Sequence, residues 1–256
     1  KGELKTEAET VLFMGCVPSY LDMKMVPSLI KPMDAAGVDY TTLSTEESCC
    51  GFPLYLMGSD DFEPRAQSLM ERLKATGASE LVTPCAGCYK TFKKIYPEVG
   101  DLGLEVYHTI HYLEKLINDG KLKFKGDLGK KVTYHDPCDL GRAFKMFDEP
   151  RNILKRIPGL EYVEMARNGL KARCCGGGGG LNGIGRYREQ RNIGLKIKRD
   201  QILATGAKMV IAPCHNCWDA IRDLEEIYKI GIRWSFLKPL LINMLEVPEH
   251  LKPKEE

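Results

Sequence analysis

Short apolar runs alternate with longer mixed stretches along this chain. In the first half, the apolar runs have the length and composition of buried strands, and several of the mixed stretches end at glycine, as helices often do. The predicted strands span residues 10–15, 38–43, 80–83 and 105–108, and the predicted helices span 25–36, 62–76, 85–96 and 110–117. Because strands and helices alternate, we expect a parallel sheet with right-handed crossovers.

The same order restarts after residues 118–129, a stretch rich in Lys, Gly and Asp. Strands are then predicted over 131–135, 162–165 and 209–212, and helices over 151–157, 186–204 and the residues after Cys217. The tetrapeptide Ala-Thr-Gly-Ala occurs at corresponding places, in residues 75–78 and 204–207. The sequence therefore predicts an α/β fold of two tandem, pseudo-repeated Rossmann-like domains. The expected limits are 1–9 for a tail or linker, 10–127 for the first domain and 128–256 for the second.

All ten cysteines belong to this repeat. Each half carries a single cysteine, then an adjacent pair followed by glycine, then a Cys-x-x-Cys, with intervening lengths of 32 and 34 residues in the first half and 35 and 38 in the second. The first cysteine set is Cys16, Cys49, Cys50, Cys85 and Cys88, and the second cysteine set is Cys138, Cys174, Cys175, Cys214 and Cys217. Each group follows a predicted strand, so the sulfurs of a set are expected to meet beyond the carboxyl ends of one parallel sheet.

The form of these motifs indicates metal binding. Two adjacent cysteines do not easily bond to each other, but both can face one object. The five glycines after Cys175 lack Cβ atoms and leave room for a bulky ligand. Each Cys-x-x-Cys begins a predicted helix, where backbone N-H groups and the helix dipole stabilise thiolates. Five thiolates exceed the four that structural zinc requires, which favours iron-sulfur chemistry with a bridging sulfur. Zinc with a spare cysteine is the alternative.

Composition narrows the function classes further. The net charge of +2 gives no case for nucleic acid as a partner, and no apolar run of membrane-spanning length occurs in the 256 residues. No secretory signal leads the chain, so we expect a cytoplasmic location, in which clustered cysteines bind metal rather than form disulfides. The polar start without Met indicates a piece of a longer chain, with domains expected upstream.

The doubled pattern of Cys, Cys-Cys-Gly and Cys-x-x-Cys resembles the CCG-domain (cysteine-rich domain) iron-sulfur proteins of the heterodisulfide reductase kind, of either the B or the D type, including the DsrK-like branch. The resemblance covers about residues 10 to 245. It implies that each cysteine set holds a non-cubane 4Fe-4S cluster and that both clusters face one cavity between the domains. There a disulfide substrate would be reduced to two thiols.

The resemblance also implies partners. Electrons would come from subunits with ordinary iron-sulfur clusters, and a membrane cytochrome b-type subunit is a further candidate that would hold the protein at the membrane. The alternative is an electron-relay subunit of a membrane-associated, quinone-linked complex of the DsrK-like kind, without a disulfide substrate. A zinc-stabilised scaffold is the third, non-redox interpretation. Clusters of this kind are expected to be oxygen-sensitive, which points to an anaerobic source.

Other polar residues near the motifs are candidates for supporting roles. His135 and Asp136 precede Cys138 and are the predicted catalytic residues, as donors or relays of a proton when a disulfide sulfur leaves as thiolate. A strand-end hydrogen bond is the alternative for both. His215, inside the second Cys-x-x-Cys, is a candidate for tuning a cluster potential or for capping the helix. The basic stretch from Arg186 to Arg199 has the composition of a solvated helix face, with attraction of an anionic thiol or an acidic partner as the alternative.

Overall fold

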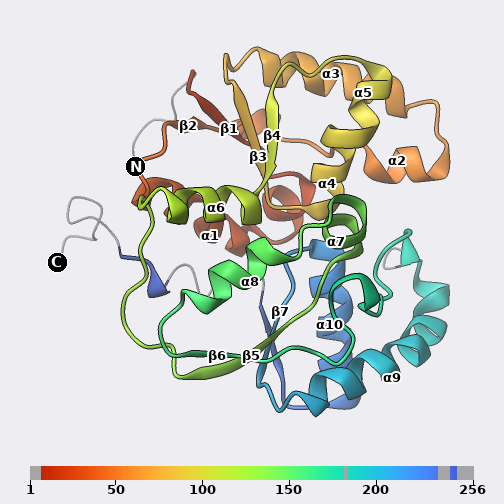
Figure 1. Cartoon of the computed structure of the whole chain (residues 1–256). Coiled ribbons are helices and arrows are strands. Elements are labelled where there is room, and N and C mark those ends of the chain that lie inside the picture. The colour runs from red at the N-terminus through yellow and green to blue at the C-terminus, as the bar shows by residue number, and fades with distance from the viewer. Residues whose placement is uncertain (1–6, 182–183, 236–242, 247–256) are drawn as a thin grey trace. The chain divides into compact units, whose positions relative to one another are not determined.

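The computed structural model describes residues 7–181, 184–235 and 243–246. The chain divides into two compact units, Lys1–Lys125 with Leu241–Glu256 as the first and Gly126–Leu240 as the second. Each unit contains a four-stranded parallel sheet flanked by helices (Figure 1). No helix within the described residues combines the length and the hydrophobicity needed to cross a membrane.

The first unit has the strand order β2-β1-β3-β4. Its strands are β1 (Thr10–Leu12), β2 (Tyr40–Thr41), β3 (Glu80–Thr83) and β4 (Glu105–His108). Its helices are α1 (Val26–Ala35), α2 (Phe52–Met57), α3 (Phe62–Lys74), α4 (Ala86–Lys90), α5 (Tyr96–Val99) and α6 (Thr109–Asn118). Single turns are η1 (Val17–Leu21), η2 (Met23–Met25), η3 (Ser44–Glu46) and η4 (Thr91–Ile95). Every residue of β1 is buried, which explains why this strand is uniformly apolar apart from Thr10.

The second unit repeats this arrangement with the order β6-β5-β7-β8. Its strands are β5 (Lys130–Tyr134), β6 (Leu160–Tyr162), β7 (Met209–Ile211) and β8 (Arg233–Ser235). Its helices are α7 (Cys138–Phe144), α8 (Asp148–Lys155), α9 (Arg188–Ala204) and α10 (His215–Tyr228), with turns η5 (Gly169–Lys171) and η7 (Gly185–Tyr187). The order of the strands is the same in both units, so the predicted α/β class and its internal repeat are confirmed.

Equivalent backbone contacts define which residues correspond. The amide of Phe13 donates to the Val82 carbonyl at 2.9 Å, and the amide of His135 donates to the Ile211 carbonyl at 2.9 Å. In both units this bond extends the central strand pair by one residue beyond the ladder. Phe13 and His135 therefore occupy the same place in the two sheets.

The last described residues differ from the sequence expectation, which assigns the chain up to residue 256 to the second domain. Phe124 pairs with Leu245 in an antiparallel bridge, and the Lys125 amide donates to the Met244 carbonyl at 2.8 Å. Residues 243–246 therefore lie with the first unit, because the backbone groups that they satisfy come from the end of that unit's chain.

Candidate metal centres

The cysteines lie where the parallel strands deliver them. Cys16 follows β1, and Cys85 stands between β3 and α4. In the second unit, Cys138 is the first residue of α7, after β5, and Cys214 stands between β7 and α10. All ten cysteines are free thiols, and within each set the single cysteine and the Cys-x-x-Cys come from the two central strands of the sheet.

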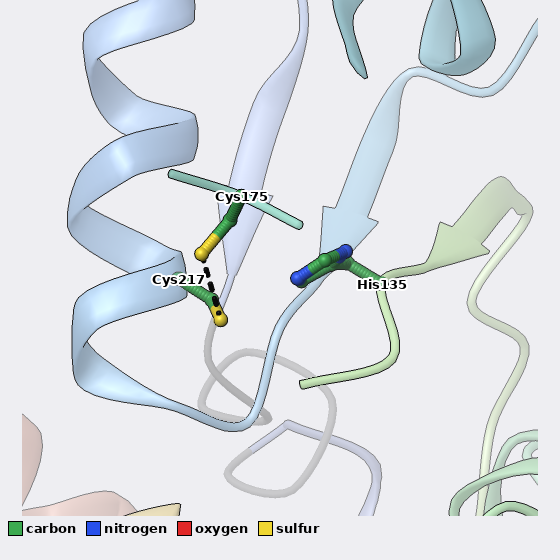
Figure 2. A group of neighbouring side chains, drawn as sticks. All are labelled: His135, Cys175 and Cys217. Atoms are coloured by element: carbon green, nitrogen blue, oxygen red, sulfur yellow. Dashed lines mark hydrogen bonds between the residues drawn. The ribbon is translucent and has the colours of Figure 1, made fainter. Parts of the chain in front are cut away.

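The two sets have the same order of contacts between sulfurs. In the first set the side-chain contacts run Cys16 to Cys49 to Cys50 to Cys88 to Cys85. In the second set they run Cys138 to Cys174 to Cys175 to Cys217 to Cys214. One link is a hydrogen bond of 3.1 Å from the Cys175 thiol to the Cys217 sulfur (Figure 2). Each set is therefore a continuous group of five thiols, which the sequence predicted from the position of each cysteine group after a strand.

Hydrogen bonds within each set shift the pKa values of neighbouring thiols in opposite directions. Hydrogen bonds from Cys16 and Cys50 lower the pKa of Cys49, and bonds from Cys138 and Cys175 lower that of Cys174. The pKa of Cys16 is raised, first by its hydrogen bond to Cys49 and then by burial, and Cys138 follows the same pattern with Cys174. Without metal, one thiolate per set is thus stabilised at the expense of its neighbours. Ionised together, the five sulfurs would repel one another, and bound metal cations would offset that repulsion, so the donor set fits a multinuclear thiolate-bound cluster.

The glycine after each cysteine pair has a backbone role. Gly51 and Gly176 adopt φ of +81° and +73°, which L side chains rarely adopt. A Cβ atom would also lie 3.1 Å from the Phe62 ring at Gly51, and 3.3 Å from the Arg191 side chain at Gly176. The amide of Gly176 donates to the Cys174 sulfur at 3.3 Å. The Cys-Cys-Gly motif thus turns the chain sharply while both sulfurs stay within one cysteine set.

A buried carboxylate ties the first set together. Glu47, which is 6% exposed, accepts hydrogen bonds from the amides of Met14 at 2.9 Å and Gly15 at 3.1 Å. These amides directly precede Cys16, and Glu47 itself lies just before the cysteine pair. The carboxylate therefore fixes the strand end and the Cys-Cys turn relative to each other.

Replacing Glu47 with alanine is expected to lower the free energy of unfolding by about 1–3 kcal/mol, because two buried amides lose their acceptors. Denaturant unfolding of the metal-free chain measures this loss, followed by far-UV circular dichroism. The matched control is Glu46→Ala, since Glu46 is exposed and the hydrogen bond that it accepts from Arg72 is to its backbone carbonyl. Equal stability of the two variants would contradict the role given to Glu47.

In the second unit the corresponding carboxylate is that of Asp136, which follows β5. Asp136 accepts from the Arg151 guanidinium at both oxygens, at 2.8 and 3.0 Å, and from the Gly169 amide at 2.8 Å. Arg151 also donates to Glu164. Asp136 is 6% exposed, so its carboxylate is buried and fully engaged in holding the segment that leads to Cys174.

His135 is placed differently from its neighbour. It is 1% exposed, and a nitrogen of its ring and the sulfurs of Cys175 and Cys217 all lie within 4.8 Å of one another. Figure 2 shows its ring pointing from the end of β5 toward these two sulfurs. Neither ring nitrogen has a hydrogen-bond partner among the described residues. Burial, followed by the charge of Lys198, holds the pKa of His135 well below its usual value. The ring is therefore neutral and available to a group bound by the sulfurs.

The basic stretch is not a uniformly solvated helix face, so that prediction is wrong for two of its residues. Lys198 is 1% exposed and directs its ammonium to the Met165 sulfur at 3.7 Å. Arg191 forms an ion pair with Asp223, and both side chains are almost fully buried. The stretch lies in η7 and α9, and the inner face of α9 packs on the unit. His215, the first residue of α10, is also buried, at 5% exposure.

Comparisons with known proteins agree with this geometry. The family described as cysteine-rich domain, CCG, matches the chain twice, over residues 10–93 and 132–222. The chain is 33% identical, over 240 residues, to the D-type subunit of dihydromethanophenazine:CoB-CoM heterodisulfide reductase from Methanosarcina acetivorans, covering 90% of this chain and 57% of that protein. It spans little more than half the length of that relative.

Two further relatives belong to other redox systems. EtfAB:quinone oxidoreductase of Syntrophomonas wolfei is 33% identical over 85% of this chain and 31% of its own length. The B-type subunit of fumarate reductase (CoM/CoB) from Methanothermobacter marburgensis is 34% identical over 86% of this chain and 42% of its own length. Among solved structures, glutamate racemase RacE1 of Bacillus anthracis matches 92% of this chain and 78% of its own length at 11% identity, with a TM-score of 0.39.

Proposed function

The chain belongs to the cysteine-rich domain (CCG) family, and from this premise we propose that each cysteine set holds a non-cubane 4Fe-4S cluster. The observation that carries the proposal is the identical order of contacts among the five sulfurs of each unit. The ligands would be Cys16, Cys49, Cys50, Cys85 and Cys88 for one cluster, and Cys138, Cys174, Cys175, Cys214 and Cys217 for the other. Five thiolates per site would supply one more sulfur than a cubane requires, which favours the non-cubane type.

The proposed reaction is the reduction of a disulfide to two thiols, with consumption of two electrons and two protons. The clusters would supply the electrons when bound, and partner subunits with ordinary iron-sulfur clusters would refill them. Support comes from the heterodisulfide reductase relatives, which match about 90% of this chain. A membrane cytochrome b-type subunit remains a proposed partner, and peripheral attachment through it a proposed location.

The two predicted catalytic residues receive different roles in this proposal. His135 carries unpaired nitrogens beside Cys175 and Cys217, so its N-H group is placed to bond a sulfur and to hold a proton on the inner side of the second set. Asp136 is committed to Arg151 and to the Gly169 amide, so we assign it to positioning. Its contribution is to keep the loop before Cys174 in place.

The variant His135→Phe gives the second unit a phenylalanine where the first unit has Phe13. The variant is expected to retain its iron, because phenylalanine already fits this place as Phe13. Loss of the N-H group that His135 holds beside these sulfurs is expected to slow disulfide reduction about tenfold to a hundredfold and to alter the EPR signal of one cluster. The matched control is His111→Phe, which removes a partly exposed histidine from α6 of the first unit. An unchanged rate and spectrum for His135→Phe would remove His135 from the proposal.

Disulfide reduction itself is tested with the anaerobic, iron-loaded chain and reduced benzyl viologen as electron donor. The probes are the CoB-CoM heterodisulfide and 2-hydroxyethyl disulfide. We expect oxidation of the dye with release of two thiols per disulfide, and no reaction in a variant that lacks one cysteine set. Iron-loaded protein that reacts with neither disulfide would overturn the enzymatic half of the proposal.

The second candidate is an electron-relay subunit of a quinone-linked complex, and the EtfAB:quinone oxidoreductase relative favours it. In that case the same ten cysteines hold the clusters, but no disulfide reacts. The two candidates separate in the viologen experiment, since a relay accepts electrons from the dye without producing thiols. Zinc in place of iron would exclude both.

A further inference from the structure

A buried ammonium group lies beside the second cysteine set. Lys198 belongs to α9 and is 1% exposed, and its ammonium donates to the weak sulfur acceptor of Met165 at 3.7 Å. Across the parts of the chain that the structure describes, no carboxylate forms an ion pair with it. Removing a cation from water without a paired anion is costly. The molecule therefore needs a negative charge close to this ammonium.

A cluster held by the second cysteine set would supply this negative charge, because its cysteine ligands would be thiolates. The ammonium interacts favourably with Cys175, Cys217 and Cys174. Asp136 also interacts with it, but that carboxylate is already neutralised by the two-point contact with Arg151. Although burial lowers the pKa of Lys198 to about 8, the group remains mostly protonated at neutral pH. Its charge is thus within electrostatic range of the second set.

The first unit has no equivalent of this charge among its described residues. Helices α3 and α9 end at the same Thr-Gly-Ala sequence, and in each the threonine hydroxyl donates to a carbonyl of the last turn at 2.6 Å. Counted back from these threonines, Leu69 occupies the place of Lys198, and it is 0% exposed. Phe13 likewise stands in the place of His135. Two apolar residues of the first unit are therefore replaced by a cation and an imidazole in the second.

A cation does lie near the first set, but in a different setting. Arg65 donates from Nε to the Cys49 carbonyl at 3.1 Å, and its side chain is partly exposed. Water and salt screen such a charge, whereas a fully buried ammonium acts through a medium of low dielectric constant. The two sets thus differ in the charge that acts on them, although their sulfurs are arranged alike.

We propose that Lys198 raises the reduction potential of the group held by the second cysteine set above that of the group held by the first set. The group at the second set would therefore accept electrons first. The inference depends only on the cluster part of the proposed function. One-electron reduction adds one negative charge to a cluster, and a nearby fixed positive charge stabilises that state. Lys198 acts on the potential through its charge alone and is not a ligand of the cluster.

The test is a mediated redox titration of the anaerobic, iron-loaded chain, followed by EPR. Cys88→Ala and Cys217→Ala, which each remove one set, assign the signals. In the wild-type chain, the second set is expected to be reduced first. Lys198→Met is expected to lower the reduction potential of the second set by about 59 mV or more for one electron. At a given solution potential, the ratio of reduced to oxidised cluster then falls about tenfold or more. Lys198→Gln is expected to act in the same direction.

The matched control is Lys196→Met, which removes the same charge from an exposed position on the same helix. An unchanged second-set potential in Lys198→Met, or an equal shift in the control, would overturn the inference. If both neutral variants fail to hold the second cluster, the titration of the wild-type chain decides. Equal potentials for the two sets, or reduction of the first set before the second, would contradict the inference. A chain that holds clusters with the expected order but reduces no disulfide would contradict the enzymatic proposal and leave this inference standing.

Discussion

Replacing Cys175 with alanine is expected to halve the iron and acid-labile sulfide bound per chain, and Cys50→Ala is expected to do the same from the other unit. These two residues are the middle members of the sulfur contact series, each linked to the pair partner and to the Cys-x-x-Cys. Both are buried, at 3% exposure for Cys50 and 2% for Cys175, so no solvent ligand readily replaces the lost sulfur. Because metal binding is coupled to the order of its site, the remaining four sulfurs are not expected to retain a full cluster.

The two variants serve as controls for each other, since they affect sets with the same contact order. Iron, sulfide and the optical spectrum are measured on anaerobically purified protein, and a variant with both substitutions should contain neither element. Loss of all iron from each single variant would show that the two sets are not separate sites. Full iron content in Cys175→Ala would show that the middle sulfur is not a ligand.

The second large effect is expected from Asp136→Ala, which should lower the free energy of unfolding of the second unit by about 3–5 kcal/mol. The substitution removes the buried partner of the Arg151 guanidinium, whose side chain is 12% exposed, and leaves the partly exposed Glu164 as its carboxylate partner. It also removes the acceptor of the Gly169 amide at 2.8 Å. The loss should occur with or without metal, because these contacts involve only protein groups.

Tryptophan fluorescence isolates this effect, because both tryptophans of the chain, Trp218 and Trp234, belong to the second unit. The matched control is Glu161→Ala, which breaks the exposed Glu161–Lys131 pair of the same unit, with side chains 66% and 36% exposed. That loss should stay below about 1 kcal/mol. If Asp136→Ala destabilises no more than the control, Asp136 is not the anchor of this loop.

The cysteine spacing and the apolar runs predicted the fold class and the grouping of five sulfurs, because both depend on short, strongly patterned segments. Runs such as 11–14 and 209–212 are short and apolar, as buried strands are, and the cysteines follow them closely. Sequence reasoning missed β8, whose residues Arg233–Ser235 are mostly polar and form a strand only by pairing with β7. It also missed α2 and α7, which begin at the cysteine motifs themselves.

The role of individual polar residues depended on tertiary contacts. Lys198 lies in a helix whose composition is that of a solvated surface, and only its position against Met165 shows that it is buried. His135 and Asp136 are adjacent in sequence, yet alternation along the extended chain sends one toward the sulfurs and the other toward Arg151. A signal for Lys198 existed in the repeat, since alignment on the two Ala-Thr-Gly-Ala segments places it opposite a leucine.

The content of iron, zinc and acid-labile sulfide per chain in anaerobically purified protein decides whether the two cysteine sets hold clusters, and EPR of the oxidised state with and without a thiol follows on the same sample. Two 4Fe-4S clusters require about eight irons and eight sulfides, and disulfide chemistry at the clusters predicts a paramagnetic signal that appears with the thiol. About eight irons without such a signal would favour the electron-relay function. Zinc without sulfide would contradict both cluster-based functions.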